Sequence, residues 1–219
     1  MTITIHQPNF MPWYPFFEKI QQADIFVLLG HCQFEKNGFQ NRFSIDNSWN
    51  TMSVKKGTES IKNKLYLNAE YDWKKLKKRL WKYKDILDEM DYCISNNLYD
   101  TNKKIIQHLI KKLNINTKLV EDFPTNLVSS ERLLIICKEH GATTYLAGQG
   151  GREYLDESIF INEGIKVIYQ ENLTKVHTLE YLKSLFLIFI QSYSGFMYFF
   201  SIIGFLPFLT LRVFQVFSN

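Results

Sequence analysis

Polar side chains follow the first strand-like run of the sequence, and they are the first candidates for chemistry. The strand-like residues 3–5 lead directly into His6, Gln7 and, two positions further on, Asn9. An imidazole beyond a strand end can act as a general acid or base, or donate a hydrogen bond to a phosphate. Side-chain amides can bind a base or a sugar, although bonds to their own loop are the structural alternative. We predict that His6 is catalytic and that Gln7 and Asn9 bind substrate.

A second strand-like run, residues 25–29, ends in a similar segment that begins with Gly30, His31 and Cys32. An adjacent cysteine and histidine suggest a nucleophile and its base. Successive residues of an extended segment point to opposite faces, however, so these two side chains are poorly placed to act together. Cys32 is therefore predicted to be a buried structural residue, and His31 is a second catalytic candidate.

The same segment continues to Gln40, Asn41 and Arg42. A guanidinium can hold a phosphate or a carboxylate through two parallel hydrogen bonds, which makes Arg42 a candidate for anion binding. The alternative is an ion pair with Glu35 or Asp24 at the edge of the sheet. Gln40 and Asn41 are predicted to orient the substrate.

A glycine-rich turn later in the chain is the third candidate region. Residues 148–152 read Gly-Gln-Gly-Gly-Arg and separate a strand-like run from a helix expected at 153–158. Glycines allow a ligand close to the backbone, and helix N-termini attract anions. The turn lacks the lysine of a P-loop and the spacing of a dinucleotide fingerprint, so a plain tight turn is the alternative. The residues predicted to bind substrate here are Gly148, Gly150, Gly151, Arg152 and Tyr154.

Strands and helices alternate along most of the chain, which is typical of an α/β fold. We expect a mixed, largely parallel sheet flanked by helices. Ligands of such sheets bind beyond the carboxyl ends of the strands, where the three polar segments fall. Strands are predicted at residues 3–5, 25–29, 39–45, 49–54, 119–120, 144–147 and 167–169. Helices are predicted at residues 15–23, 72–92 (with Asp72 as its cap), 98–113, 129–140 and 153–158.

The chain is expected to divide into a main domain and an atypical tail. The main domain covers residues 1–176, with a helical insert at about 72–113 that forms a lid, and a hydrophobic tail covers 177–219. Residues 185–211 contain no charged side chain, and this length exceeds the roughly 20 apolar residues that span a bilayer. Polar residues and a proline interrupt the run. A membrane anchor, a pair of buried core segments and an aberrant end from a shifted reading frame are the alternatives.

Net charge indicates the kind of ligand that the protein binds, and cysteine usage bears on metal sites and on the cellular compartment. The formal net charge of +4 and the pI of about 8.8 suit an anionic ligand such as a nucleotide, but they are too mild to indicate nucleic acid. Three widely spaced cysteines without a CxxC pair argue against zinc, and no metal site is predicted. Their odd number and the lack of a secretory signal predict a cytoplasmic protein. The sequence specifies no cofactor.

A basic segment lies in the helix predicted at 72–92. Seven lysine and arginine residues between positions 74 and 84 alternate with the aromatic residues Trp73, Trp81 and Tyr83. We expect a solvated basic face, with the aromatic stripe turned toward the core.

Two motifs give the chain a resemblance to the WbqC-like family. Residues 6–13 read His-Gln-Pro-Asn-Phe-Met-Pro-Trp, and a second motif spans 145–151. The similarity covers roughly residues 1–170, and members are associated with bacterial surface polysaccharide gene clusters. The resemblance implies a transferase that modifies a nucleotide-linked amino sugar, by acyl or aminoacyl transfer, in O-antigen or capsule biosynthesis. Further positions that carry the likeness are Lys19, Ala23, Asp24, residues 33–37, residues 40–42, Tyr154 and Leu155.

The chain also departs from the family pattern, which leaves alternatives open. Gly30 and His31 stand where members tend to carry an acidic pair, and the hydrophobic tail replaces the usual C-terminal motifs. One hypothesis is a cytoplasmic transferase that acts on a nucleotide-linked sugar, with its acyl donor unspecified. Another is a non-catalytic sugar-nucleotide binder or assembly protein, tethered to the inner membrane through residues 185–211, or an inactive remnant. An ATP-dependent ligase is a third hypothesis, which rests on fold analogy.

Overall fold

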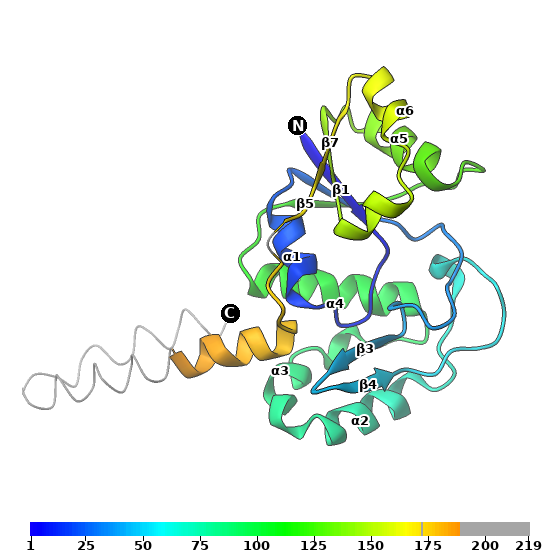
Figure 1. Cartoon of the computed structure of the whole chain (residues 1–219). Helices are drawn as coiled ribbons and strands as arrows, with labels where there is room; N and C mark the ends of the chain where they lie inside the picture. The colour runs from blue at the N-terminus through cyan, green and yellow to red at the C-terminus, as the bar shows by residue number, and fades with distance from the viewer. Residues whose placement is uncertain (172, 189–219) are drawn as a thin grey trace, which may run out of the picture. The chain divides into compact units, whose positions relative to one another are not determined.

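Five parallel strands form the central sheet, in the order β5-β2-β1-β6-β7 (Figure 1). The computed structural model describes residues 1–171 and 173–188. The chain divides into two units, Met1–Leu179 and Glu180–Asn219, and every predicted site residue lies in the first. In the second unit, the described residues 180–188 are helical. The strands are β1 (Thr2–His6), β2 (Ile25–Leu28), β5 (Lys118–Glu121), β6 (Thr144–Ala147) and β7 (Lys166–Tyr169).

The strand order reverses between β1 and β6. The chain runs outward from β1 through β2 to β5, then returns to β6 and continues outward to β7 on the other side. All four pairs of the sheet are parallel, with Thr4 of β1 opposite both Phe26 of β2 and Leu146 of β6. Doubly wound sheets of this order bind their ligands at the reversal. The helices are α1 (Tyr14–Gln21), α2 (Ala69–Arg79), α3 (Lys84–Asp88), α4 (Leu98–Lys112), α5 (Ser129–Glu139) and α6 (Glu157–Asn162).

Alternation of side chains along the strands explains the two helical layers. Ile3 and Ile5 of β1 join one buried cluster with α5 and α6. Phe26 of β2 contacts Phe16 of α1, with ring centroids 5.5 Å apart. Because successive strand residues point to opposite faces, each strand packs against both layers. In Figure 1, α1 and α4 lie on one side of the sheet, and α5 and α6 lie on the other.

A separate antiparallel ribbon follows β2. Its strands β3 (Arg42–Ile45) and β4 (Ser48–Thr51) are joined by Asp46 and Asn47, which have positive φ angles of 51° and 57°. Positive φ at both central residues is typical of a type I′ turn, whose twist matches that of paired strands. The mixed sheet expected from the sequence is therefore resolved into a parallel sheet and a separate antiparallel ribbon.

The helix predicted at 72–92 is interrupted. It breaks at Leu80, which leaves the helical region with φ −95° and ψ 37°, and α3 follows after a short 3-10 turn. Asp72 is not the cap of α2, because Asn68 occupies that position. The Asp72 carboxylate instead accepts a hydrogen bond from the backbone N–H of Ser53 at 2.6 Å.

Helix α4 belongs to the core of the first unit and does not have the form of a separate lid. Its Ile105 is fully buried, and so is Asn102. The Asn102 side-chain N–H groups donate to the carbonyl oxygens of Pro8 and Gln40, both at 2.7 Å. Its side-chain oxygen accepts a hydrogen bond from the Tyr66 hydroxyl at 3.3 Å. A single amide thus joins α4 to the loop after β1 and to the segment before β3.

The helix predicted at 153–158 begins later than expected. A 3-10 helix covers Gln149–Glu153, directly after β6. Helix α6 then begins at Glu157, because the Asp156 side chain caps it by accepting from the backbone N–H of Ser158 at 3.0 Å. The glycine-rich turn therefore leads into a short 3-10 turn and not directly into an α-helix.

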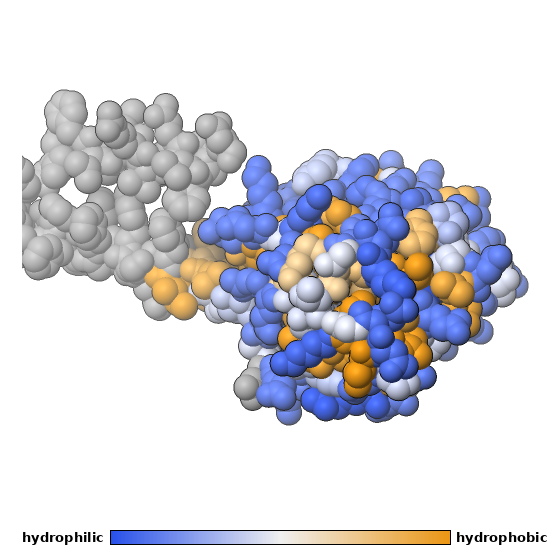
Figure 2. Space-filling model, turned by 90° about the horizontal axis from the view of Figure 1, so that it is seen from above, coloured by the Kyte–Doolittle hydropathy of each residue, from blue (hydrophilic) through white to orange (hydrophobic). Residues whose placement is uncertain are grey.

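In the part of the chain that the structure describes, no helix is long and apolar enough to cross a membrane. The membrane contact predicted for 185–211 falls largely on residues 189–211, which lie outside the described residues. Seen from above, the described surface mixes hydrophilic and apolar residues (Figure 2).

Replacing Asn102 with alanine should destabilise the fold by about 2–4 kcal/mol, because two carbonyl groups and a hydroxyl lose a buried hydrogen-bond partner. Urea unfolding followed by circular dichroism measures this loss. The exposed Asn116 is the matched control, and its change to alanine should alter the free energy of unfolding by about 0.5 kcal/mol or less. Equal effects of the two substitutions would contradict the role assigned to Asn102.

Candidate functional site

The carboxyl ends of β1 and β6 lie side by side at the reversal of strand order. The register pairs Thr4 with Leu146, so His6 and Gly148 leave the sheet next to each other. From β1 the chain passes to α1 on one face, whereas from β6 it passes to α6 on the other face. The connections diverge at this point, which we call the switch point, and it is the usual ligand site of such sheets.

Lys19 of α1 lies buried at this switch point. The residue is only 2% exposed, and its ammonium group donates to the Ile5 carbonyl oxygen at 3.4 Å. A Cβ atom added to Gly148 would lie 3.9 Å from the same nitrogen. Burial lowers the pKa of Lys19 from 10.5 to about 7, because a low-dielectric surrounding disfavours the charged form. An amine that can gain or lose a proton near neutral pH therefore lies at the switch point.

His6 is a neutral imidazole at the same place. Burial, together with the nearby charge of Lys19, lowers the pKa of His6 to about 3. Its Nδ1 donates to the carbonyl oxygen of Gln7 at 2.9 Å, which leaves Nε2 as an acceptor. The ring contacts Phe16 edge to face, with centroids 4.9 Å apart. His6 is thus suited to hold a substrate donor, and a role in proton transfer stays a prediction.

Two glutamines connect the end of β1 with the segment before β3. The Gln40 amide donates to the Gln7 side-chain oxygen at 2.6 Å, and Gln40 is 1% exposed. The Gln40 side-chain oxygen has no hydrogen-bond partner among the described residues. Beside Gln7, burial raises the pKa of the Cys32 thiol to about 11. Cys32 is therefore a protonated thiol at neutral pH and not an activated nucleophile.

A charged cluster lies at the ends of β2 and β5. The buried Asp122 carboxylate accepts from the backbone N–H of Gly30 at 2.8 Å and contacts His31 Nδ1 at 2.9 Å. The same carboxylate pairs with the guanidinium of Arg132, on α5, at 2.7 Å. The sequence lacks an acidic pair at positions 30 and 31, and Asp122 brings a carboxylate to this place from β5. It fixes the orientation of His31, whose catalytic role remains a prediction.

Arg42 and Asn41 make their contacts within the antiparallel ribbon. The Arg42 guanidinium lies 4.1 Å from the centre of the Trp49 ring and donates to the Asn37 carbonyl oxygen. The Asn41 amide donates to the Met52 carbonyl oxygen at 2.7 Å. Neither the ion pair of Arg42 with Glu35 nor that with Asp24 occurs among the described residues, and none of these contacts joins Arg42 to His6.

The glycine-rich turn divides into two parts. Gly148 faces Lys19, whereas Gly151 is buried, and a Cβ there would lie 3.3 Å from Ala147 and 3.4 Å from Tyr169. The Arg152 guanidinium stacks 4.2 Å from the centre of the Tyr169 ring, away from the switch point. The remaining predicted contacts are Gly150 and Tyr154, which are exposed, and Asn9, which is half-buried.

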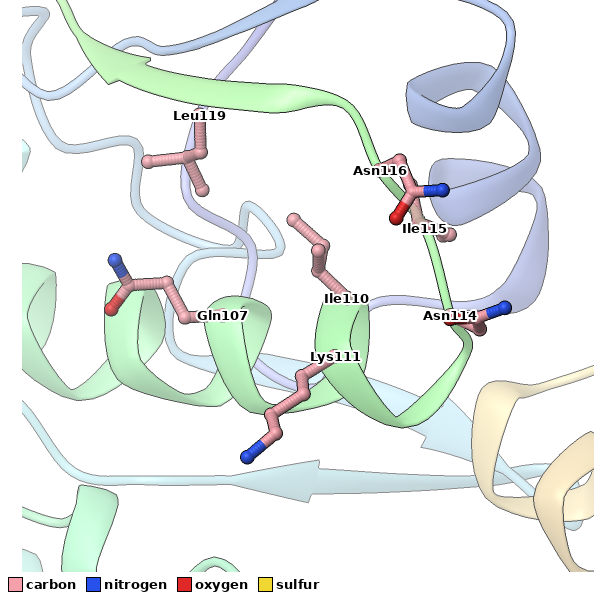
Figure 3. Close-up of a pocket in the computed structure, with 7 residues that line it drawn as sticks. All are labelled: Gln107, Ile110, Lys111, Asn114, Ile115, Asn116 and Leu119. Carbon is pink, nitrogen blue, oxygen red and sulfur yellow. The ribbon is translucent and has the colours of Figure 1, made fainter.

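Two hollows on the described surface differ in chemistry. A hollow of ≈ 580 Å³ is lined by polar residues of α1 and of the end of β7, including Glu18 and Gln170. A smaller one of ≈ 290 Å³ lies between α4 and the start of β5, where Ile110 and Leu119 face each other (Figure 3). Only the first borders the carboxyl end of a strand, β7, and neither hollow is lined by His6, Lys19 or Gly148. No group of three or more potential metal ligands occurs among the residues described.

Three residues of this region were not predicted to act in the site: Lys19, Asp122 and Arg132. Lys19 lies between Phe16 and Ile20 on the buried face of α1, and a lysine in an apolar stripe is a signal that the sequence offers. Asp122 directly follows β5, so the rule that located His6 applies to it as well. Arg132 could not be located in this way, because it lies on a helix, α5, and not at a strand end. Its partner Asp122 is 10 residues earlier in the chain.

Comparison with known proteins gives a family match and similarities to two individual proteins. The pattern of the WbqC-like protein family matches residues 7–206, and so includes most of the segment 177–219. The uncharacterized protein Rv1507c of Mycobacterium tuberculosis (strain ATCC 25618 / H37Rv) is 27% identical over 186 residues, which cover 76% of this chain and 80% of that protein. A Zn(II)-bound mutant variant of AdcAII from Streptococcus pneumoniae is 12% identical, with a TM-score of 0.20, and the match covers 84% of this chain and 97% of that chain. A TM-score this low supports no conclusion.

Replacing Lys19 with methionine should remove a pH dependence of stability. Between the folded pKa of about 7 and the ordinary value of 10.5, the unfolded chain holds a proton that the folded protein lacks. The free energy of unfolding of the wild type should therefore rise with pH in this window, by up to about 1.4 kcal/mol per pH unit, and be insensitive to Lys19 below it.

Urea unfolding of the wild type and of K19M from about pH 6 to about pH 10 measures this linkage. The free energy of unfolding of the wild type, minus that of K19M, should increase with pH. The exposed Lys166 provides the control, and K166M should follow the wild type throughout. A constant difference between K19M and the wild type would mean that Lys19 titrates as an ordinary lysine.

Replacing Asp122 with asparagine should destabilise the protein by about 3–5 kcal/mol, because the buried guanidinium of Arg132 loses its counter-charge. The measurement is urea unfolding at neutral pH. The exposed Asp85 serves as the control, with an expected effect of about 0.5–1 kcal/mol for D85N. A D122N variant as stable as D85N would show that the cluster does not stabilise the strand ends.

Proposed function

The chain belongs to the WbqC-like protein family, and we propose that it is a transferase which modifies a nucleotide-linked amino sugar by acyl or aminoacyl transfer. The observation that carries the proposal is the buried amine of Lys19, with a pKa of about 7, at the switch point of the sheet. Perturbed pKa values cluster at functional sites, and a general base works best when its pKa lies near the working pH.

In the proposed reaction, the amino group of the sugar attacks the carbonyl carbon of an activated acyl donor. A bond forms between this nitrogen and the carbonyl carbon, and the bond from that carbon to the leaving group breaks. The neutral amine of Lys19 takes the proton that the attacking nitrogen loses and returns it to the leaving group. Lys19 suits this step better than His6, because an imidazole with a pKa of about 3 is a weak base.

The other residues at the switch point would orient the substrate. His6 Nε2 is an acceptor for a sugar hydroxyl or amine, since Nδ1 is engaged with Gln7. Gly148 and Gly150 let an anionic group approach the backbone, and no atom lies within 4 Å of a Cβ added at Gly150. The formal net charge of +4 favours an anionic ligand such as a sugar nucleotide.

A cytoplasmic location and a role in O-antigen or capsule assembly are part of the proposal. Cys32, Cys93 and Cys137 are free thiols, in keeping with a reducing compartment.

A second candidate function is a sugar-nucleotide binder without catalytic activity. The observation that favours it is the protonation state of the other groups near the switch point. His6 remains neutral and the Cys32 thiol remains protonated at neutral pH. Of these three groups, only Lys19 is therefore suited to acid–base chemistry at this pH.

The test is an activity assay of the full chain with a panel of nucleotide-linked amino sugars and of thioester and aminoacyl donors. We expect product formation with a kcat/KM that rises with pH through an inflection near 7, because the free amine is the active form. K19M should lower kcat by about 10²–10⁴-fold, whereas the exposed control K166M should match the wild type.

Calorimetric titration of the same sugar nucleotides separates the two candidate functions. Binding without turnover by any donor would support the binder and contradict the transferase. Full activity of K19M would remove the role proposed for Lys19.

A further inference from the structure

A basic aromatic surface lies on the solvent side of α2 and of the turn after it. We define it by Tyr71, Lys74, Lys75, Lys78 and Trp81, all of which are exposed. The first four follow the i, i+3, i+4, i+7 spacing of a single helix face. The opposite face of α2 is buried through Trp73 and Leu76. Trp81 corrects the expectation that the aromatic residues turn to the core, because 75% of it is exposed, and Tyr71 is 67% exposed.

The lysines of this surface carry charge that the protein does not neutralise. Other lysines of the segment are paired, such as Lys77 with Asp88 at 2.8 Å and Lys82 with Asp46 at 2.7 Å. In contrast, the lysines at positions 74, 75 and 78 make no ion pair among the described residues. Three positive charges therefore gather between two exposed aromatic side chains, and an anionic partner would complement them.

The antiparallel ribbon extends this surface. The Arg79 guanidinium donates to the Trp49 carbonyl oxygen at 2.7 Å and so ties β4 to the end of α2. Trp49 is 47% exposed and Phe39 is 54% exposed, with ring centroids 5.8 Å apart. Figure 1 shows β3, β4 and α2 together at the lower edge of the described fold. The ribbon that Arg79 holds against α2 thus adds two exposed aromatic side chains.

We infer that the basic aromatic surface docks on an anionic lipid bilayer. Tryptophan and tyrosine favour the membrane–water interface, where an apolar ring and a polar edge are both satisfied. Lysine side chains can lay their methylene groups on the bilayer and reach the anionic headgroups with their ammonium groups. The surface supplies both kinds of contact on one helix and one ribbon, and it does not depend on residues 185–211.

Two other macromolecular partners fit the surface less well. The centre of a protein–protein interface is depleted in lysine, whereas lysine is central here. Nucleic-acid sites favour free arginine, and the two arginines of the region are engaged within the protein, Arg79 with Trp49 and Arg42 with Asn37. The net charge of +4 is also low for a nucleic-acid-binding protein.

Co-sedimentation of the full chain with vesicles tests the inference. We expect binding to phosphatidylcholine vesicles that contain phosphatidylglycerol, and much weaker binding to phosphatidylcholine alone. The triple variant K74Q/K75Q/K78Q should bind the anionic vesicles about a hundredfold more weakly, because each lysine near the surface adds to the electrostatic attraction. W81S should weaken binding by about tenfold, through loss of the interfacial ring.

The control is K104Q/K118Q/K166Q, which removes three positive charges from exposed positions elsewhere and should keep the wild-type affinity. Circular dichroism of each variant checks that the fold is intact. Equal binding by both triple variants, or equal binding to both kinds of vesicle, would overturn the inference. Loss of single-stranded RNA binding by K74Q/K75Q/K78Q, with vesicle binding unchanged, would also overturn it and assign the surface to nucleic acid.

Discussion

The parallel pairing of β1 with β6 is the constraint on which the candidate site depends. It joins residues 142 positions apart, and the Thr4 hydroxyl donates to the Leu146 carbonyl oxygen at 2.8 Å in a fully buried position. This register brings His6 beside Gly148. The following helix packs on one face of the sheet and carries Lys19 under both strand ends. A shift of one residue would exchange the faces of the strand and separate these groups.

Burial of one amine, that of Lys19, determines the electrostatics of the switch point. A lysine in a low-dielectric surrounding is costly to keep charged, so its pKa falls toward neutrality. Burial, together with the same amine, holds the neighbouring imidazole of His6 in its neutral form by lowering its pKa. At the ends of β2 and β5, the opposite arrangement occurs, because Asp122 and Arg132 compensate each other's charge. The switch point thus contains a group that titrates near neutral pH, Lys19, whereas the adjacent strand ends contain the buried ion pair of Asp122 and Arg132.

Sequence patterns predicted the parallel core well, because hydrophobic runs and the alternation of strands and helices are local signals. The strands at 3–5, 25–29 and 144–147 were found close to their observed positions. Boundaries that depend on distant partners were missed. Asp72 has the residue type of a helix cap, yet it accepts a hydrogen bond from Ser53 instead. Trp81 follows the helical periodicity of its neighbours, but the break at Leu80 turns it to solvent.

The sequence by itself determined the α/β class and the placement of polar residues after the first two strands, since both follow from local residue order. It also offered a signal for Lys19, a lysine in an apolar helix face, which the prediction missed. Only the tertiary structure decided which polar segments meet. It placed His6, Lys19 and Gly148 together and left Arg42 stacked on Trp49. The physical reason is that strand order and register arise from contacts between distant segments, and burial, which sets the pKa of Lys19, exists only after those contacts form.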